Sequence, residues 1–255
     1  MGTYLHLFDE EQNYTDYVNS AQYREPYGVG IKTTYKAHYN KYNYNGKYHK
    51  YITDGLVFHL DGTDCTGTQW QDRISGKILS LSGSAPSVSN GGVVFNGASV
   101  FYNTTIIPPA YNVGTIEVVL NNRVTESTGK WIVGHGTADG ICFTINTAYH
   151  ETSFRLSTSN YPRRLGLTEN NKIYTHSITT TYNIVNKQSK NSASNDYWGL
   201  GYCFSVGGKI TNNSFARDKM CKSTVYQIRI YNRKLTYNEI INNQTVDIEK
   251  YNISI

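Results

Sequence analysis

Short apolar segments separated by Gly, Asn and Ser recur along the chain from residue 55 onward. This alternation of apolar segments and turn residues constrains the fold more than any other feature. Each segment has the length of a strand rather than that of a helix. Many short strands with frequent turn residues are typical of a sandwich or a barrel. We therefore predict an all-β fold of two antiparallel sheets packed face to face. The strands are expected within residues 55–62, 77–81, 92–97, 98–103, 115–122, 130–136, 140–147, 153–158, 173–183, 200–208 and 223–232, and residues 183–199 are expected to form a long exposed loop.

The last of these segments, VYQIRIYNRKLTYNEI at residues 225–240, begins as a strand. Tyr226, Ile228 and Ile230 share one face of a period-2 pattern, and Gln227 and Arg229 share the other. This alternation predicts an antiparallel strand with one buried face and one face in contact with water.

The same segment then takes on the pattern of a helix start. Thr236 precedes Glu239 by three residues, which is the spacing of a capping box. Leu235 and Ile240 stand where a hydrophobic staple would close the first turn. The sequence predicts a short C-terminal helix that covers the end of a sheet.

Residues 1–51 hold 11 of the 23 tyrosines and few of the aliphatic residues that a core requires. Asn45-Gly46, between tyrosine-rich flanks, predicts a hairpin turn. Two interpretations stay open: an arm that packs on the next domain, or an assembly element that becomes buried against a neighbouring subunit, since Tyr is enriched at interfaces. We expect an anchoring or oligomerisation segment over 1–52 and a sandwich over 53–255. The candidate interface residues are Tyr35, Tyr39, Tyr42, Tyr44 and Tyr48.

The charge and hydropathy patterns argue against two classes of partner. The net charge of +5 comes from scattered basic residues, whereas a nucleic-acid binder gathers them on one face. No apolar run approaches the ~20 residues that span a bilayer. The opening MGTYLHLFDEEQ lacks the basic and apolar regions of a secretory signal. We expect no nucleic acid or membrane partner, and synthesis in a cytoplasm.

The sequence gives little support for a metal or another cofactor. Asp61 and Asp64 in LDGTD could ligate calcium with loop carbonyls, although a turn is the favoured interpretation of the Asp-Gly pair. The cysteines form no CxxC pair, so a zinc site has no support, and buried thiols are expected although one disulfide stays open. They are Cys65, Cys142, Cys203 and Cys221.

Several motifs recur in a known order. DGLVFHLDG is followed by Trp70-x-Asp72 with Ser75-Gly76, then by VVFNGAS, TIEVVL, IVGHG and the closing VYQIRIYNRKLTYNEI. Over residues 53–250 this order resembles the concanavalin A-like lectin/glucanase superfamily, in its laminin-G-like branch. The resemblance implies a jelly-roll sandwich.

Glucanases of that superfamily carry carboxylates in a pattern such as E-x-D-x-x-E on one strand, because hydrolysis needs an acid and a nucleophile. In TIEVVLNNR only Glu117 is acidic, since Val119 and Asn121 replace further carboxylates. His59 and His135 suggest no triad because a GxSxG elbow is absent, and we expect them to be half-buried strand or turn residues. We therefore predict that the protein is not an enzyme.

The N-terminal residues YLHLFDEEQNYTDYVNSAQYREPYGVG, followed by HYNK, are similar to the opening of structural proteins from tailed phages of gut Bacteroidales, the crAss-like group. Tyr27 replaces the usual Trp after Glu25-Pro26. This resemblance implies a generic assembly module in a virion, made in the host cytoplasm. Other virion proteins, such as capsid or fibre subunits, would be the partners of a homo-oligomer or of many copies on the particle.

Sugar binding is the functional expectation for the sandwich. Asp196, Tyr197 and Trp198 lie in the expected loop, where aromatic faces could stack on a sugar and the carboxylate could hold a hydroxyl. The alternative is that they pin the loop or contact another subunit. Trp70 and Trp131 begin apolar strands and are expected in the core.

Together these patterns indicate a non-enzymatic virion structural protein, capsid-decorating or associated with a head or tail fibre. Its lectin-like domain would adhere to host-surface or mucin glycans, and display in many copies would turn weak affinity into avidity. The alternative is a bacterial carbohydrate-binding protein without a virion role. A glycoside hydrolase is the least favoured interpretation.

Overall fold

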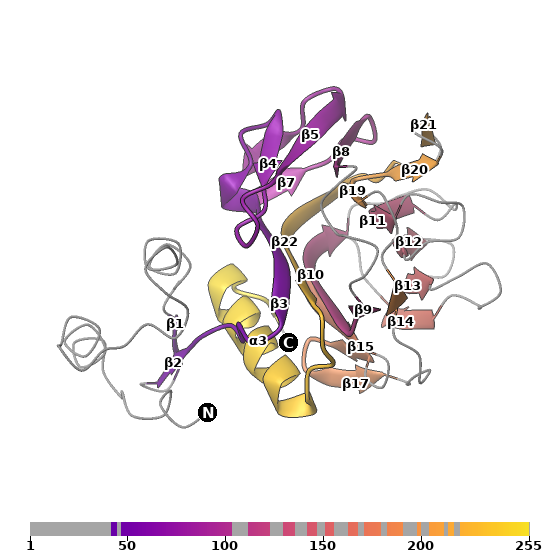
Figure 1. Cartoon of the computed structure of the whole chain (residues 1–255). Coiled ribbons are helices and arrows are strands. Elements are labelled where there is room, and N and C mark those ends of the chain that lie inside the picture. The colour runs from indigo at the N-terminus through magenta and orange to yellow at the C-terminus, as the bar shows by residue number, and fades with distance from the viewer. Residues whose placement is uncertain are drawn as a thin grey trace.

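Over the residues that the structure describes, the protein is an antiparallel β-sandwich with one helix packed on it (Figure 1). The computed structural model describes residues 42–44, 47–103, 112–122, 130–135, 142–146, 151–155, 163–167, 171–179, 183–190, 198–199, 204–211, 214–216 and 220–254. The expected all-β jelly-roll class is confirmed, and every strand predicted from the sequence overlaps a strand of the structure.

The first sheet has eight strands in the order β17-β16-β15-β10-β22-β7-β6, with β3 paired to β22 beside β7. Its strands are β3 (Leu56–Asp61), β6 (Ser87–Ser89), β7 (Gly92–Val94), β10 (Thr115–Asn122), β15 (Ile173–Thr179), β16 (Asn183–Val185), β17 (Gln188–Lys190) and β22 (Ser223–Tyr231).

The second sheet also has eight strands, in the order β14-β13-β12-β11-β19-β8-β5-β4. They are β4 (Gln69–Gln71), β5 (Ile78–Gly83), β8 (Ser99–Asn103), β11 (Lys130–His135), β12 (Cys142–Asn146), β13 (Glu151–Arg155), β14 (Arg163–Leu167) and β19 (Phe204–Val206). The remaining elements are the pairs β1 (Tyr42–Tyr44) with β2 (Lys47–His49), β9 (Asn112–Val113) with β18 (Trp198–Gly199) and β20 (Lys209–Thr211) with β21 (Ser214–Ala216), the short 3-10 turn η2 (Gly62–Asp64) and the helix α3 (Tyr237–Tyr251).

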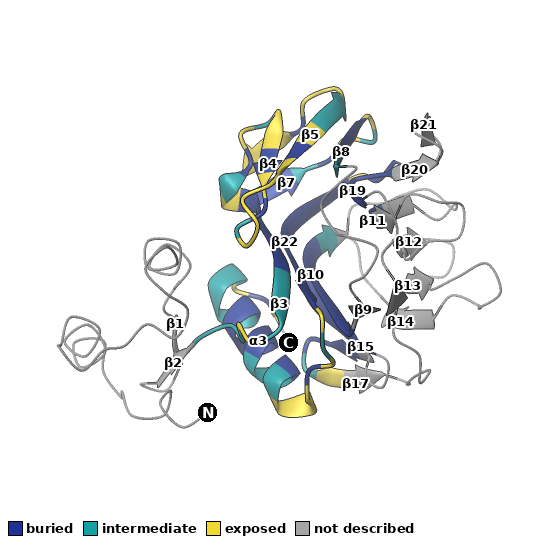
Figure 2. Ribbon diagram, in the orientation of Figure 1, coloured by how far each residue is buried: buried dark blue, intermediate teal, exposed yellow. Residues whose placement is uncertain are grey.

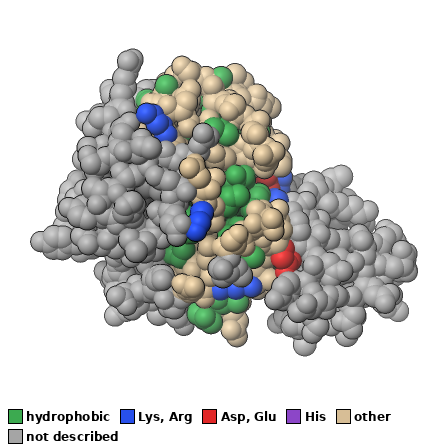
Figure 3. All heavy atoms as spheres, turned by 180° about the vertical axis from the view of Figure 1, so that it is seen from behind, with side chains coloured by type: hydrophobic (Ala, Val, Ile, Leu, Met, Phe, Trp, Pro, Cys, Tyr) green, Lys and Arg blue, Asp and Glu red, His purple; other side chains and the backbone are tan. Residues whose placement is uncertain are grey.

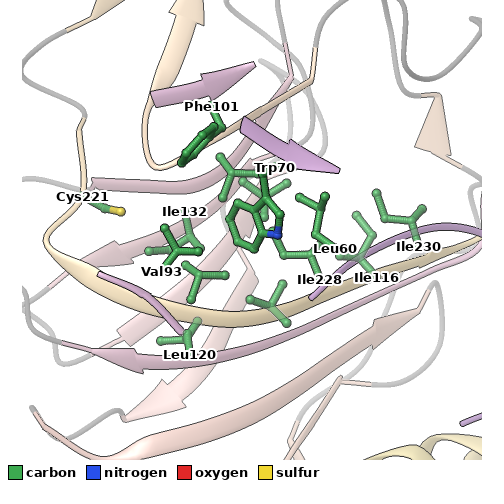
Figure 4. Close-up of a cluster of buried hydrophobic side chains, with 14 of the residues drawn as sticks. Leu60, Trp70, Val93, Phe101, Ile116, Leu120, Ile132, Cys221, Ile228 and Ile230 are labelled. Carbon is green, nitrogen blue, oxygen red and sulfur yellow. The ribbon is translucent and has the colours of Figure 1, made fainter. Parts of the chain in front are cut away.

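The core fills the space between the two sheets (Figure 4). Leu60, Ile116 and Ile228 from the first sheet face Trp70 and Phe101 from the second, and each is at most 1% exposed. The indole Nε1 of Trp70 donates to the carbonyl of residue 61 at 2.7 Å, so its polar atom is satisfied inside the core. The predicted core position of Trp70 is confirmed.

The Trp70-x-Asp72 motif shapes one edge of the first sheet. An Asp72 oxygen accepts the amide of His59 in β3 at 2.7 Å, and the amide of Arg73 donates back to the carbonyl of His59 at 2.9 Å. Asp72 also accepts the amide of Ser75 and so holds the β4–β5 turn. The motif therefore covers edge groups of β3 that would otherwise be free to pair with another chain.

The prediction that one face of residues 225–231 contacts water is wrong. All nine residues of β22 are buried, because α3 packs over the outer face of the first sheet (Figure 2). Tyr226 is also on the other face from Ile228: a β-bulge shifts the register opposite Val119 and Leu120, and Tyr226 packs with Val119 outside the core.

The helix start is confirmed and its place is corrected. Thr236 and Glu239 form the predicted capping box, and Leu235 and Ile240 pack together as the staple requires. The helix covers the face of the first sheet rather than its end, since Asn243 bonds side chains from both β10 and β22. Within the described residues no helix is both long and apolar enough to traverse a lipid bilayer.

The exposed loop predicted over residues 183–199 is wrong for residues 183–190, whereas residues 191–197 lie outside the described residues. The strands β16 and β17 form a hairpin there, and Asn186 and Lys187 both take positive φ angles at its turn. Ile184 is fully buried, and the amide of Lys187 donates to the side chain of Gln244 in α3 at 2.6 Å. The short apolar pair before Asn186 was the signal for this hairpin.

Candidate functional site

The outer face of the second sheet presents a row of uncharged polar side chains. In β4, Gln69 and Gln71 are exposed on either side of the buried Trp70. In β5, Ser80 is exposed next to the buried Leu79. Strand alternation therefore places these glutamines and Ser80 on the side away from the core.

Strand pairing aligns these residues with an aromatic side chain. Gln69 pairs with Ser80, and Ser80 pairs with Tyr102 of β8. Tyr102 is half-buried and packs on Val100 and Met220, outside the main core. We call Gln69, Gln71, Ser80, Ser82 and Tyr102 the outer platform.

The outer platform carries no charge. Figure 3 shows that the described surface seen from behind is largely tan, with isolated charged side chains. The arginines whose side chains the structure describes each pair with a carboxylate: Arg73 with Asp64, Arg229 with Glu117 and Arg233 with Glu239. None of these three belongs to the platform.

Glu117, the acidic residue considered for hydrolysis, is fully buried under α3. Its carboxylate accepts from Arg229 Nε at 2.8 Å, from Ser177 Oγ at 2.9 Å and from Asn243 Nδ2 at 2.8 Å. Burial raises the pKa of Glu117, although the Arg229 guanidinium opposes this rise. All its bonds go to the protein, so it offers nothing to a substrate.

A second carboxylate, which sequence reasoning missed, lies close to Glu117. Asp247 of α3 accepts two bonds from Arg229, at 2.8 and 2.6 Å, so one guanidinium bridges both acids. Asp247 is fully buried as well, and Thr175 and Tyr51 donate to it at 2.6 and 2.8 Å. The signal that could have found it was the group Asn243, Gln244, Thr245 and Asp247, which is too polar for the buried face of an ordinary helix.

The two aspartates considered for calcium face cationic side chains. Asp61 lies 3.0 Å from Arg73 and 2.8 Å from Lys250, and Asp64 lies 2.5 Å from Arg73. Although burial opposes ionisation, Lys250 and Arg73 hold the pKa of Asp61 well below its usual range. Among the described side chains no group of three or more His, Cys, Asp or Glu could hold a metal ion.

Other expectations have mixed outcomes. Cys65 and Cys221 are buried free thiols, as expected. His59 is buried in β3, only 3% exposed, rather than half-buried. The pairing of β1 with β2, with residue 44 opposite 47, confirms the hairpin around residues 45–46.

The predicted sugar and interface residues stay predictions. Asp196 and Tyr197 lie outside the described residues, and Trp198 is described only as backbone in β18, paired with β9. Tyr35 and Tyr39 also lie outside them. The side chains of Tyr42, Tyr44 and Tyr48 in the β1–β2 hairpin are likewise not described.

Comparison with protein-family models and with curated proteins found no match. Among solved structures, the chain is similar to the Trypanosoma rangeli sialidase in complex with sialic acid, with a TM-score of 0.64 at 15% identity over 87% of this chain and 38% of that one. It is also similar to domain 4 of AbnA, a GH43 extracellular arabinanase from Geobacillus stearothermophilus, in complex with arabinotriose (TM-score 0.54, 14% identity, 74% of this chain and 98% of that one). A third similar structure is the binding domain of Paraclostridial Mosquitocidal Protein 1 (TM-score 0.54, 13% identity, 75% and 52%). At these identities the likeness shows the fold alone, and this chain matches well under half of the sialidase.

Proposed function

We propose that the protein is a non-enzymatic carbohydrate-binding protein whose outer platform takes a neutral oligosaccharide. The observation that carries this proposal is the uncharged row Gln69–Ser80–Tyr102 on a solvent-facing sheet. Amide and hydroxyl groups can donate to and accept from sugar hydroxyls, and a tyrosine ring offers an apolar face beside a polar tip. Asp196, Tyr197 and Trp198 stay a separate set of sugar contacts expected from the sequence, and the platform proposal does not depend on them.

One of the similar structures supports this choice of ligand class, and another supports a binding role without naming a ligand. The arabinanase domain, which this chain matches over 98% of its length, was solved with arabinotriose, and the third similar structure is named as a binding domain. The sialidase activity is not carried over, because this chain matches only 38% of that protein.

The non-enzymatic part of the proposal rests on Glu117. Its burial and its bonds to Arg229, Ser177 and Asn243 leave it no route to a glycosidic bond. The test is incubation with mixed-linkage glucan, arabinan and host capsular polysaccharide. We expect no release of reducing sugar, whereas release that Glu117→Gln abolishes would overturn this part.

Binding is tested with the full chain on a glycan array, followed by calorimetry on the best neutral oligosaccharide. Tyr102→Ala and Gln69→Ala should each weaken binding about tenfold, the effect of losing one stacking or hydrogen-bonding group. Ser87→Ala on β6 of the first sheet is the matched control and should bind as the parent does. Thermal unfolding of each variant separates lost binding from lost folding, and unchanged binding in both platform variants would end the proposal.

A virion role is the second candidate, favoured by the N-terminal resemblance to phage structural proteins. In this role residues 1–52 anchor the protein among capsid or fibre subunits and the sandwich is displayed outward in many copies. Light scattering on the full chain and on residues 50–255 tests the anchor: an oligomer that becomes a monomer on truncation is expected. Mass spectrometry and immunogold labelling of purified particles test the location, and absence of the protein from particles would exclude the role.

A further inference from the structure

Residues 50–52, here called the strap, are bonded on both sides to the sandwich. On one side, Asn242 of α3 donates to the carbonyl of Lys50 at 2.6 Å, and the amide of Ile52 donates to the side chain of Asn243 at 2.8 Å. On the other side, the hydroxyl of Tyr231 in β22 donates to the carbonyl of Ile52 at 3.0 Å. The strap thus joins α3 to the first sheet.

Tyr51 contacts the buried charged cluster below α3, which consists of Arg229, Glu117 and Asp247. Its hydroxyl donates to Asp247 at 2.8 Å, and its ring lies 4.1 Å from the guanidinium carbon of Arg229. Burial raises the pKa of Tyr51 well above its usual value, so the hydroxyl keeps its proton and remains a donor. Without Tyr51, the guanidinium of Arg229 would lose the cation–π contact on one of its faces. Asp247 would also lose a hydrogen-bond donor in a site closed to water.

The strap belongs to the same chain as the sheet that it contacts. The amide of Leu56 donates to the carbonyl of Thr53 at 3.1 Å, and the turn formed there leads directly into β3. Because this connection is so short, the strap cannot be supplied by another copy while β3 stays in place. The chain before Lys50 therefore joins the sandwich beside Asn242 of α3, and the β1–β2 hairpin lies next to the same helix.

We propose that the strap couples the N-terminal arm to α3, so that a partner that holds the arm also sets the position of α3 on the first sheet. The coupling is reciprocal: loosening the strap loosens α3, and loosening the α3 contact frees the strap. Residues 50–52 therefore work as part of the sandwich, not as a flexible linker. This inference does not depend on whether the outer platform binds sugar.

The test is amide hydrogen exchange on the full chain, read separately for α3, for residues 50–52 and for β8. Tyr51→Ala should speed exchange in α3 about tenfold or more with little change in β8, since α3 opens as a local unit. Tyr51→Phe, which keeps the ring and removes the hydroxyl, should have a smaller effect. Asn238→Ala, at an exposed position on the same helix, is the control and should leave α3 unchanged.

The reciprocal test uses Asn242→Ala, which removes the bond to the Lys50 carbonyl. Exchange at residues 50–52 should rise while the charged cluster stays intact. Unchanged exchange in α3 for Tyr51→Ala would overturn the proposal. An equal rise in α3 and β8 for both Tyr51 variants would also overturn it, because the strap would then be an undifferentiated part of the core.

Discussion

Arg229 donates from Nε to Oε2 of Glu117 at 2.8 Å, and neither side chain is more than 1% exposed. The same guanidinium holds Asp247 on its other side. Charges taken out of water are tolerated only when they are paired and fully hydrogen-bonded. Glu117, on which a hydrolytic mechanism would depend, is therefore part of the contact between the first sheet and α3.

Loss of Arg229 should destabilise the fold strongly. Arg229→Met leaves Glu117 and Asp247 buried without their cation, and we expect a loss of about 3–5 kcal/mol in the free energy of unfolding. Arg233→Met, which removes a partly exposed pair, should cost about 1 kcal/mol or less. Urea unfolding at pH 7 measures both, and equal costs would contradict the structural role of the cluster.

His176 should make the protein less stable as the pH falls. Burial lowers the pKa of His176 in the folded protein to about 3, below the value of 6.5 in the unfolded chain. Above pH 6.5 neither state takes up the proton and the full stability is present. Between pH 6.5 and 3 only the unfolded state takes it up, so stability falls by up to about 1.4 kcal/mol per pH unit.

The measurement is urea unfolding from pH 7 to pH 5, above the ordinary pKa values of Asp and Glu. The His176→Leu variant should lose less stability over this range than the parent. Parallel curves for the two proteins would show that another group causes the decline.

The pattern of short apolar segments was enough to predict the sandwich and its strands, because strand length and turn residues are local signals. The capping box was equally readable, since Thr236 and Glu239 are three residues apart. The buried outer face of β22 was not readable from the strand itself. Gln227 and Arg229 are polar, as residues of a solvent-exposed face are. That α3 covers them is indicated only by the polar residues on the buried side of that helix.

The candidate site was less predictable for a similar reason. Ser80 and Tyr102 are 22 residues apart in sequence and become neighbours only through the pairing of β5 with β8. Glu117 was singled out by the resemblance to glucanases, yet its partner Arg229 and the second carboxylate, Asp247, lie in other elements. The pattern within one strand does not encode which residues of the next strand it pairs with. The β-bulge beside Tyr226 also moves that side chain to the opposite face of the sheet, and no local sequence signal predicts it.

The helix start offers a prediction with its own pH dependence. Thr236→Ala removes the acceptor for the Glu239 amide and should lower the free energy of unfolding by about 1 kcal/mol.

The hydrogen bonds from Arg233, with those from Thr236, lower the pKa of Glu239 to about 2. This contribution is fully present above the ordinary value of 4.5 and is lost as the pH falls through about 2. Thermal unfolding at pH 6 and pH 3 should show a larger drop for the parent than for Glu239→Gln, and equal drops would contradict the assignment.

Alanine substitutions at two turn glycines of the second sheet distinguish the cost of a left-handed backbone from the cost of a steric clash. Gly83 ends β5 at a φ of +92°, and a Cβ there would lie 2.0 Å from the carbonyl oxygen of Ala98. Gly76 has a φ of +71°, but the nearest atom to its Cβ would be 3.9 Å away, on Gln71. Replacement by Ala should therefore cost about 1 kcal/mol at Gly76, from the left-handed backbone alone.

Gly83→Ala should cost at least about 2 kcal/mol more than Gly76→Ala, because the backbone must move apart at the β5–β8 pairing. The carbonyl of Ala98 also accepts the amide of Ser84 at 3.0 Å, so that bond would be strained as well. Urea unfolding gives the two costs. Sugar binding by Gly83→Ala, measured where the variant is still folded, should fall because Ser80 and Tyr102 share the disturbed pairing, whereas Gly76→Ala should bind as the parent does. Equal destabilisation by the two variants would mean that the contact with Ala98 does not limit this turn.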